Sequence, residues 1–178
     1  MKTINVIGCG KVGRTLARLG TERGVWEVRC VLNRSLGSAE RAVEFVGSGR
    51  AVESYAALER ADVVMISASD EAIEGCCRQL CEAGAIGQGA IVFHCSGSLA
   101  SAILGPARAR GAAIASVHPV KSFADPASDV QTFAGTFCAV EGDPGACEVL
   151  GGVFCCLGAE TFPVDPEFKT VYHAATVM

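Results

Sequence analysis

A glycine-rich turn near the start of the chain limits its possible folds more than any other feature of the sequence. Gly8, Gly10 and Gly13 form the pattern GCGKVG, which follows a predicted strand at 3–7 and opens a predicted helix at 11–23. The first glycine permits a tight turn, the second lets the backbone approach a pyrophosphate, and the third lets the helix pack on the strand. The free N–H groups at the helix start attract the pyrophosphate, so we predict a dinucleotide site. Its predicted contacts at this turn are Gly8, Cys9, Gly10, Lys11, Val12 and Gly13.

Strand-like and helix-like stretches alternate along the rest of the chain. The run 63–67 is continuously apolar, as expected for a strand in a parallel sheet that is covered on both faces. This alternation predicts an α/β fold with a Rossmann-type, doubly wound, mostly parallel sheet. The further predicted strands are 28–32, 51–53, 90–95, 112–117, 136–140 and 160–164. The further predicted helices are 39–46 capped by Ser38, 70–83, 99–110, 144–157 capped by Asp143, and one beginning at Pro166 with Asp165 as its cap.

Two regions are expected along the sequence. Residues 1–165 are predicted to form the nucleotide-binding unit, with a core over 1–125 and a β/α extension over 126–165. The helix that begins at Pro166 reaches Met178 without a glycine, asparagine or proline to stop it. Because helices usually end at such residues, we expect 166–178 to be the first part of a truncated C-terminal helical domain.

The end of the second predicted strand indicates which dinucleotide binds. Sites that prefer NAD place Asp or Glu there to accept a hydrogen bond from the ribose 2′-hydroxyl. This chain has Asn33, Arg34 and Ser35 instead. The guanidinium of Arg34 suits a 2′-phosphate, and Ser35 can donate a further hydrogen bond. We therefore predict NADP(H) as the cofactor, with a solvated surface role for Arg34 as the alternative.

Composition and charge exclude several classes of partner. The formal net charge is −4 and the basic residues form no stripe, which argues against a nucleic-acid partner. The apolar runs are too short to cross a membrane, and the first residues lead directly into a strand, so we expect a cytoplasmic protein. The ten cysteines include no C-x-x-C pair; we expect them to be small core residues in a reducing compartment, with metal or disulfide roles as the alternative. No metal site is predicted.

Ligands of open α/β sheets bind beyond the carboxyl ends of the strands. Ala68, Ser69 and Asp70 follow the predicted strand at 63–67, so we expect them to contact the cofactor. A helix N-cap is the alternative role for Asp70.

The next two loops carry the candidates for chemistry. Hydride transfer to a carbonyl or imine needs a proton donor near the reacting bond. His118 and Lys121 follow the strand at 112–117 and are of suitable types, while Ser96, after the strand at 90–95, is placed to orient a substrate. The alternatives are a turn role for His118 and a capping role for Ser96, and we expect His94 to be a buried core residue.

Seven segments in sequence order resemble a known family. They are GCGKVGRTLARL, VLNRS, ADVVMISASDEAI, FHCSGSLASAIL, SVHPVKSFADP, FCAVEGD and FKTVYHAA. The family consists of poorly characterised NADP oxidoreductase-like proteins with an N-terminal Rossmann domain and a C-terminal helical domain of unknown function. It is related to pyrroline-5-carboxylate reductase and the deazaflavin-dependent NADP oxidoreductases. The resemblance implies a small-molecule substrate and a homodimer formed where the helical domain is present.

Lys169 and His173 are further candidates on the last predicted helix. They are four residues apart and therefore share one face. A lysine with a polar partner one turn later resembles the arrangement in 3-hydroxyacid dehydrogenases, where the lysine is the acid/base group, although His173 stands where those enzymes have asparagine. A solvated helix face is the alternative.

These observations favour an NADP(H)-dependent oxidoreductase that transfers hydride to or from a small carbonyl, imine or hydroxyacid. Two alternatives stay open. One is a sensor or regulatory module that binds NADP(H) without catalysis. The other is a prephenate dehydrogenase-like enzyme, which would need several arginines for two substrate carboxylates, and none lies near His118 in the sequence.

Overall fold

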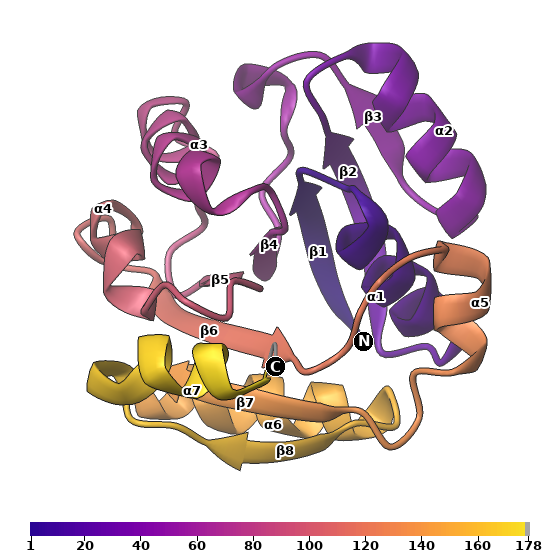
Figure 1. The fold of residues 1–178 in the computed structure, drawn as a ribbon. Helices are drawn as coiled ribbons and strands as arrows, with labels where there is room; N and C mark the ends of the chain where they lie inside the picture. Colours follow the sequence, from indigo (N-terminus) through magenta and orange to yellow (C-terminus); the bar gives the residue numbers. More distant parts are fainter. Residues whose placement is uncertain (177–178) are drawn as a thin grey trace.

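A computed structural model describes residues 1–176 and places helices on both faces of an eight-stranded sheet (Figure 1). The strands are β1 (Lys2–Ile7), β2 (Trp26–Leu32), β3 (Arg50–Val52), β4 (Val63–Ile66), β5 (Ile91–His94), β6 (Ala113–Pro119), β7 (Phe137–Gly142) and β8 (Glu160–Pro163). Their order is β3-β2-β1-β4-β5-β6-β7-β8, and every neighbouring pair is parallel except β6 and β7. The predicted fold class, a doubly wound and mostly parallel sheet, is confirmed.

The helices divide between the two faces of the sheet. They are α1 (Lys11–Glu22), α2 (Leu36–Val46), α3 (Asp70–Glu82), α4 (Gly105–Arg108), α5 (Pro126–Gln131), α6 (Pro144–Cys156) and α7 (Lys169–Thr176). Short 3₁₀ turns lie at Tyr55–Ala57, Ser101–Leu104 and Pro166–Phe168. Apolar side chains of α1, α2 and α6 pack on one face, and those of α3 and α4 pack on the other. The carboxyl ends of the parallel strands β1, β4, β5 and β6 meet at one edge of the sheet.

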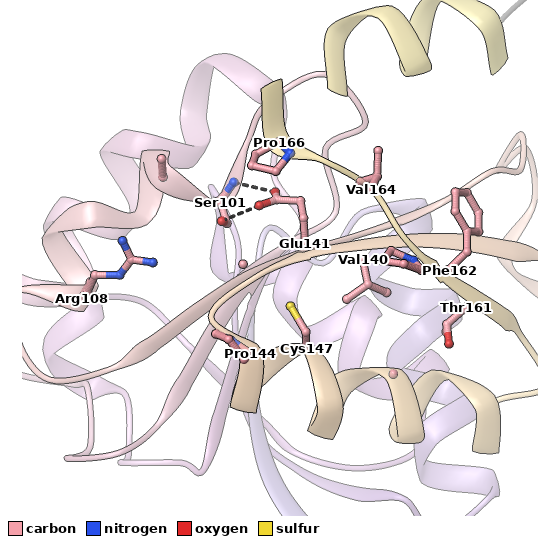
Figure 2. A pocket seen from close by; sticks show the side chains of 14 residues that line it. Ser101, Arg108, Val140, Glu141, Pro144, Cys147, Thr161, Phe162, Val164 and Pro166 are labelled. Atoms are coloured by element: carbon pink, nitrogen blue, oxygen red, sulfur yellow. Dashed lines mark hydrogen bonds between the residues drawn. The ribbon is translucent and has the colours of Figure 1, made fainter. Parts of the chain in front are cut away.

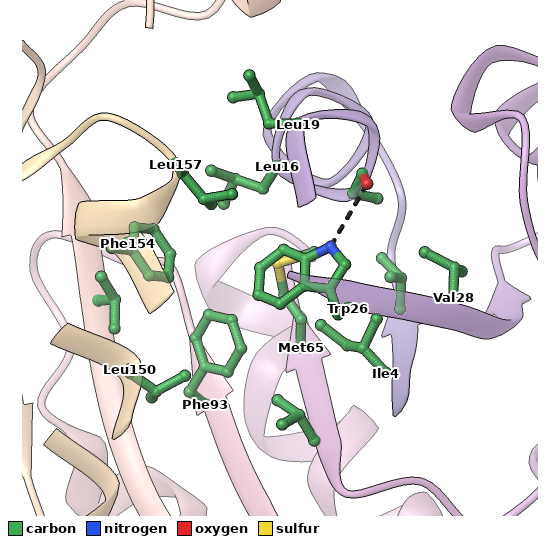
Figure 3. Close-up of a cluster of buried hydrophobic side chains, with 14 of the residues drawn as sticks. Ile4, Leu16, Leu19, Trp26, Val28, Met65, Phe93, Leu150, Phe154 and Leu157 are labelled. Carbon is green, nitrogen blue, oxygen red and sulfur yellow. Dashed lines mark hydrogen bonds between the residues drawn. The ribbon is translucent and has the colours of Figure 1, made fainter. Parts of the chain in front are cut away.

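The larger of the two cores lies under α1 and α6 (Figure 3). Phe93 of β5 meets Phe154 of α6 edge to face, with ring centroids 6.1 Å apart. Trp26 is buried under α1, and its indole N–H donates a hydrogen bond of 3.4 Å to the carbonyl of Ala17. Burying a large apolar side chain of this kind stabilises a fold by roughly 1.5–3 kcal/mol. These contacts fix α1, which follows the glycine-rich turn, firmly on the sheet.

The reversed strand β7 brings residues of β6 and the C-terminal part of the sheet together. In the antiparallel pairing, Ser116 lies opposite Glu141, and His118 lies opposite Ala139. The chain between β6 and β7 forms α5, which packs against α1. Strands β7 and β8 thus extend the same sheet.

One predicted helix start was wrong by three residues, and the N-cap role considered for Asp70 is not observed. Helix α2 begins at Leu36 with an extended Ser35 at its N-cap, because the Ser35 carbonyl already accepts the first helical bonds; Ser38 lies inside the first turn. Helix α3 has Ser69 at its N-cap, and Asp70 is its first residue. The Asp70 side chain turns toward the hydroxyls of Ser96 and Ser98 and does not cap the helix.

Two other local predictions also differ from the structure. The predicted helix at 99–110 is a 3₁₀ turn at Ser101–Leu104 followed by the short α4, because Pro106 lacks the N–H that a continuous helix would need there. Asp143 occupies the N-cap position of α6, but its carboxylate accepts from the Ile114 N–H on β6 and from Arg108.

Helix α5 was not predicted, although Asp125 caps it by accepting from the Ser128 N–H. Asp165 caps the turn at Pro166–Phe168 as predicted.

The cysteines lie mainly within the apolar packing. Cys9, Cys30, Cys77, Cys81 and Cys138 are buried in the two cores, as expected for small hydrophobic residues. Within residues 1–176, no helix is both long enough and apolar enough to cross a membrane. The predicted helix from Pro166 continues to Thr176, and its last two positions, 177 and 178, lie outside the described residues.

Candidate functional site

A cavity of about 780 Å³ lies at the carboxyl ends of β1, β2 and β4. It is lined at the glycine-rich turn by Gly8, Cys9 and Gly10, and across the cavity by Ala68 and Ser69. Gly8 has a φ of +74°, and a Cβ there would lie 2.8 Å from the backbone of Ala68, so only glycine fits. The close approach of these two loops forms the floor on which a pyrophosphate would bind.

Asn33 joins the glycine-rich turn to the second βα unit. Its side-chain carbonyl accepts a 2.6 Å hydrogen bond from the Cys9 N–H, and its amide donates at 3.0 Å to the carbonyl of Ser38. Asn33 also lines the cavity. Its amide therefore holds the turn in shape in addition to any contact with a cofactor.

Two arginines, one after β2 and one on α1, line the cavity. Arg34 is exposed, as is suitable for a group that binds a phosphate from solvent. Arg14, on the first turn of α1, has a buried Nε with no hydrogen-bond partner among the described residues. Sequence reasoning missed Arg14, although its place directly after the third glycine could have suggested it. Glu53, an acidic residue, also belongs to the lining of this cavity.

The other predicted cofactor residues lie around this cavity without lining it. Lys11 is exposed on α1, and Ser35 is the N-cap of α2. Gly13 is buried beneath the turn, where a Cβ would collide with the Ser67 hydroxyl. Its role is the close packing of helix and strand.

A second cavity of about 230 Å³ adjoins the first, since both are lined by Ser67 and Ala68. It brings together residues from five separate parts of the chain, including the three loops after β4, β5 and β6. Its other lining residues are Val12, Asp70, Cys95, Ser96, Gly97, His118, Pro119, Lys121, Phe123 and His173. We call this the reaction cavity.

His118 is the central polar group of the reaction cavity. Its Nδ1 lies 3.3 Å from the Tyr172 hydroxyl, and its ring meets that of His173 edge to face at 5.2 Å. Burial, and to a smaller extent the nearby His173 and Lys169, lower the pKa of the His118 imidazole to about 4. His118 is thus neutral at pH 7, able to accept a proton or to donate a neutral N–H, but not to act as an imidazolium.

Gly97 allows these rings to approach the loop after β5. A Cβ at Gly97 would lie 2.7 Å from Nε2 of His118 and would collide with Nδ1 of His173. The glycine is therefore needed for space rather than for an unusual backbone angle. Helix α7 can contact the sheet at this point because residue 97 has no side chain.

Lys169 does not line the reaction cavity. It is 1% exposed, and its ammonium donates to the Leu99 carbonyl and the Ser116 hydroxyl and lies 3.3 Å from Oε1 of Glu141. Burial lowers the pKa of Lys169, and the Glu141 carboxylate opposes that shift. The solvated helix face considered for this residue is wrong, because α7 lies with Lys169 against β6 and β7.

Glu141 completes this buried cluster and was not singled out from the sequence. Its two carboxylate oxygens accept from the N–H and hydroxyl of Ser101, each at 2.7 Å (Figure 2). His94, also buried, lies within hydrogen-bond distance of the Ala100 carbonyl at 3.3 Å, as expected for a core histidine. Together these bonds tie the loop at 99–101, β7 and α7 into one unit.

Ser96 and Lys121 line the reaction cavity but are held by protein groups. The Ser96 hydroxyl donates to Oδ2 of Asp70 at 2.9 Å and accepts from the N–H groups of Ser98 and Leu99. The Lys121 ammonium donates to Thr132 at 3.0 Å and lies 3.8 Å from the buried Asp129. Both predictions of a catalytic role stay untested, and both side chains would need to exchange a partner to bind a substrate.

A third cavity, of about 640 Å³, lies over β7 and β8 (Figure 2). Its lining includes Glu141, Cys147 and Phe162 but none of the residues that line the other two cavities. It is thus separate from the carboxyl edge of β1, β4 and β5, where the glycine-rich turn lies.

A glycine-rich turn at the carboxyl edge of a doubly wound sheet, with a cavity along β1, β2 and β4, defines a dinucleotide-binding domain of the Rossmann type. The chain belongs to the Rossmann-like domain family, whose model matches residues 2–119. No curated protein matches the chain.

Several solved structures have the same fold. The protein TM1727 from Thermotoga maritima is 25% identical over 98% of this chain, with a TM-score of 0.75. A candidate NADP oxidoreductase from Bacteroides fragilis is 19% identical over 99%, with a TM-score of 0.83. Arogenate dehydrogenase from Synechocystis is 22% identical over 94%, with a TM-score of 0.78. The chain covers 62%, 65% and 61% of these three structures, respectively, which is less than two thirds of each.

Proposed function

We propose that this chain is the cofactor-binding part of an NADP(H)-dependent oxidoreductase that acts on a small carbonyl, imine or hydroxyacid. The observation that carries the proposal is the continuity of two cavities. The larger follows the glycine-rich turn to Arg34, and the smaller begins at Ser67 and Ala68 and ends at His118. A dinucleotide bound along the first cavity would reach the second with its nicotinamide end.

The preference for NADP(H) rests on charge at the end of β2. Arg34 and Arg14 both line the larger cavity, whereas the residues directly after β2, 33–35, include no carboxylate. A planar guanidinium binds a phosphate with two parallel hydrogen bonds. The 2′-phosphate of NADP(H) is the group that such a pair would recognise.

The residues of the reaction cavity suit a hydride transfer. When bound, the cofactor supplies or accepts the hydride. His118 would position the reacting oxygen or nitrogen through Nε2, while the Tyr172 hydroxyl at Nδ1 sets which ring nitrogen carries the proton. Lys169 would be a positioning residue. It would hold α7 against the sheet, so that Tyr172 and His173 reach His118.

Calorimetric titration with NADPH and NADH tests the cofactor assignment. We expect NADPH to bind at least about tenfold more tightly than NADH, and Arg34→Ala to abolish that difference, since a charge-assisted phosphate contact contributes roughly 1.5–3 kcal/mol. Arg41→Ala serves as the matched control, because Arg41 is exposed on α2 and does not line the cavity. Equal affinities for the two nucleotides would overturn the NADP(H) assignment.

Turnover separates an enzyme from a binding module. An enzyme would consume NADPH with at least one carbonyl or imine acceptor. A sensor would bind NADPH with the same preference and leave it unoxidised by every acceptor. A prephenate dehydrogenase-like activity would require cations for two carboxylates, and Lys121, the lysine in the described lining of the reaction cavity, is already bonded to Thr132.

A further inference from the structure

The reaction cavity contains a carboxylate that is held in a fixed position. Asp70, the first residue of α3, accepts hydrogen bonds at Oδ2 from the Ser96 hydroxyl at 2.9 Å and from the Ser98 hydroxyl at 2.6 Å. Two donors on one oxygen orient the carboxylate toward the loop after β5, beside His118. Asp70 lines the reaction cavity and not the larger cofactor cavity.

No cation of the described lining neutralises Asp70. Lys121 lies in the same cavity, but its ammonium faces Thr132 and Asp129. Lys169 lies outside the lining and is paired with Glu141 at 3.3 Å. Among residues 1–176, Asp70 is in no ion pair, so the cavity presents one negative charge to whatever enters.

Two polar groups of the reaction cavity, His118 and Ser96, offer little acid. Burial lowers the pKa of His118 to about 4, so its ring is neutral at pH 7. The Ser96 hydroxyl hydrogen is bonded to Asp70, and its oxygen already accepts from two backbone N–H groups. Reduction of a ketone needs a proton donor for the oxygen, whereas reduction of a protonated imine does not, because its nitrogen already carries the proton.

We infer that the substrate of the proposed oxidoreductase is a cation: a protonated imine in the reducing direction, or the matching amine in the oxidising direction, with its N–H group on Asp70. This inference rests on the proposed function and names its substrate class. Hydride from NADPH forms a C–H bond at the imine carbon, and the C=N π pair becomes the nitrogen lone pair. NADPH becomes NADP⁺, and the amine product takes its next proton from water.

Three small ligands of similar shape and different charge test the inference. The chain is saturated with NADP⁺ and titrated with pyrrolidinium, cyclopentanol and cyclopentanecarboxylate, followed by NMR chemical shifts. We expect pyrrolidinium to bind at least about tenfold more tightly than cyclopentanol and cyclopentanecarboxylate to bind weakest, as an opposite charge at close range favours a ligand by about that factor. Tighter binding of the carboxylate or the alcohol would overturn the inference.

Asp70→Asn removes the charge and keeps an oxygen that can accept from Ser96 and Ser98. We expect it to lower pyrrolidinium affinity at least about tenfold while leaving cyclopentanol binding unchanged. Glu71→Gln is the matched control, because Glu71 is exposed on the same helix turn and lines neither cavity. If Asp70→Asn instead weakens NADP⁺ and NADPH by a similar factor, Asp70 is a cofactor residue and the assignment to the substrate fails.

The two levels of proposal fail in different ways. If the substrate is not a cation, the chain still binds NADPH, and only the preference for pyrrolidinium is absent. Failure of the proposed function appears first, as no binding of NADPH or NADH by the wild-type chain in calorimetry. In a turnover assay with NADPH, 2-methyl-1-pyrroline should be reduced faster than cyclopentanone, and the reverse order would count against a cationic substrate.

Discussion

The ammonium of Lys169 lies 3.3 Å from the carboxylate of Glu141, and both side chains are buried. The pair joins the first residue of α7 to β7, next to the Ser116 hydroxyl on β6. A buried ion pair is costly to form but much more costly to leave half complete. This makes the pair the main polar anchor of α7.

Lys169→Met should therefore destabilise the fold strongly. We expect a loss of about 3–5 kcal/mol in the free energy of unfolding, since Glu141 would keep a buried charge without its partner. Urea unfolding measures this change. The double variant Lys169→Met/Glu141→Gln should recover most of the loss, because glutamine removes the buried charge and keeps an acceptor for Ser101; additive losses in the double variant would contradict the explanation.

Gly97→Ala should displace α7 from the sheet. The new methyl group would lie 2.7 Å from His118 Nε2 and collide with His173, so we expect a loss of about 1–3 kcal/mol of stability. Thermal unfolding checks the magnitude, and faster amide hydrogen exchange in α7 checks the location.

Gly75→Ala is the control for that variant. Gly75 lies inside α3, and a Cβ there would meet nothing within 4 Å. Alanine should stabilise this helix by up to about 1 kcal/mol. Equal loss of stability in both glycine variants would mean that the crowding at His118 is not the cause.

Acid should destabilise the protein through two buried histidines. The pKa values of His94 and His118 are both lowered to about 4, chiefly by burial, from an ordinary value of 6.5. Between pH 6.5 and 4 the unfolded chain binds protons at these rings and the folded chain does not. Stability is therefore fully present above pH 6.5 and falls toward pH 4, by on the order of 3 kcal/mol for each ring.

NMR titration of the imidazole resonances measures this directly. The rings of His94 and His118 should keep their neutral-form shifts below pH 5, and urea midpoints should fall over the same range. Midpoints near 6.5 for both rings would show that burial does not shift them.

Arg14→Met should weaken NADPH binding. Arg14 lines the larger cavity, and its buried Nε has no hydrogen-bond partner among the described residues, which suits it to an anionic oxygen of the cofactor. We expect a loss of at least about tenfold in calorimetry, because hydrogen bonds to charged groups contribute roughly 1.5–3 kcal/mol. Arg41→Met should bind NADPH as the wild type does, and unchanged affinity in Arg14→Met would remove Arg14 from the site.

Local patterns predicted the parts of the fold that local forces determine. The glycine-rich turn and the apolar run at 63–67 were found because backbone freedom and burial leave direct traces in the sequence. The meeting of Ser96 and His118 was predicted as well, since the carboxyl ends of neighbouring parallel strands share one edge.

Contacts between distant segments were not predictable in this way. The direction of β7 has no signature in the sequence, so its antiparallel pairing, which sets Glu141 beside Ser116, was missed. The burial of Lys169 depends on that pairing, which is why a solvated surface was a reasonable alternative. Arg14 was missed, although it directly follows the third glycine, because its position alone does not fix the direction of a long side chain.

The packing of Trp26 gives this chain an optical reporter. Trp26 is the single tryptophan, and its indole contacts α1 at Ala17 and so closely at Gly20 that a Cβ there would collide with the ring. The fluorophore thus lies beneath the helix that follows the glycine-rich turn. Reduced nicotinamide absorbs in the range where tryptophan emits, so energy transfer from Trp26 can report cofactor binding, and a red shift of its emission can report unfolding, in the unlabelled protein.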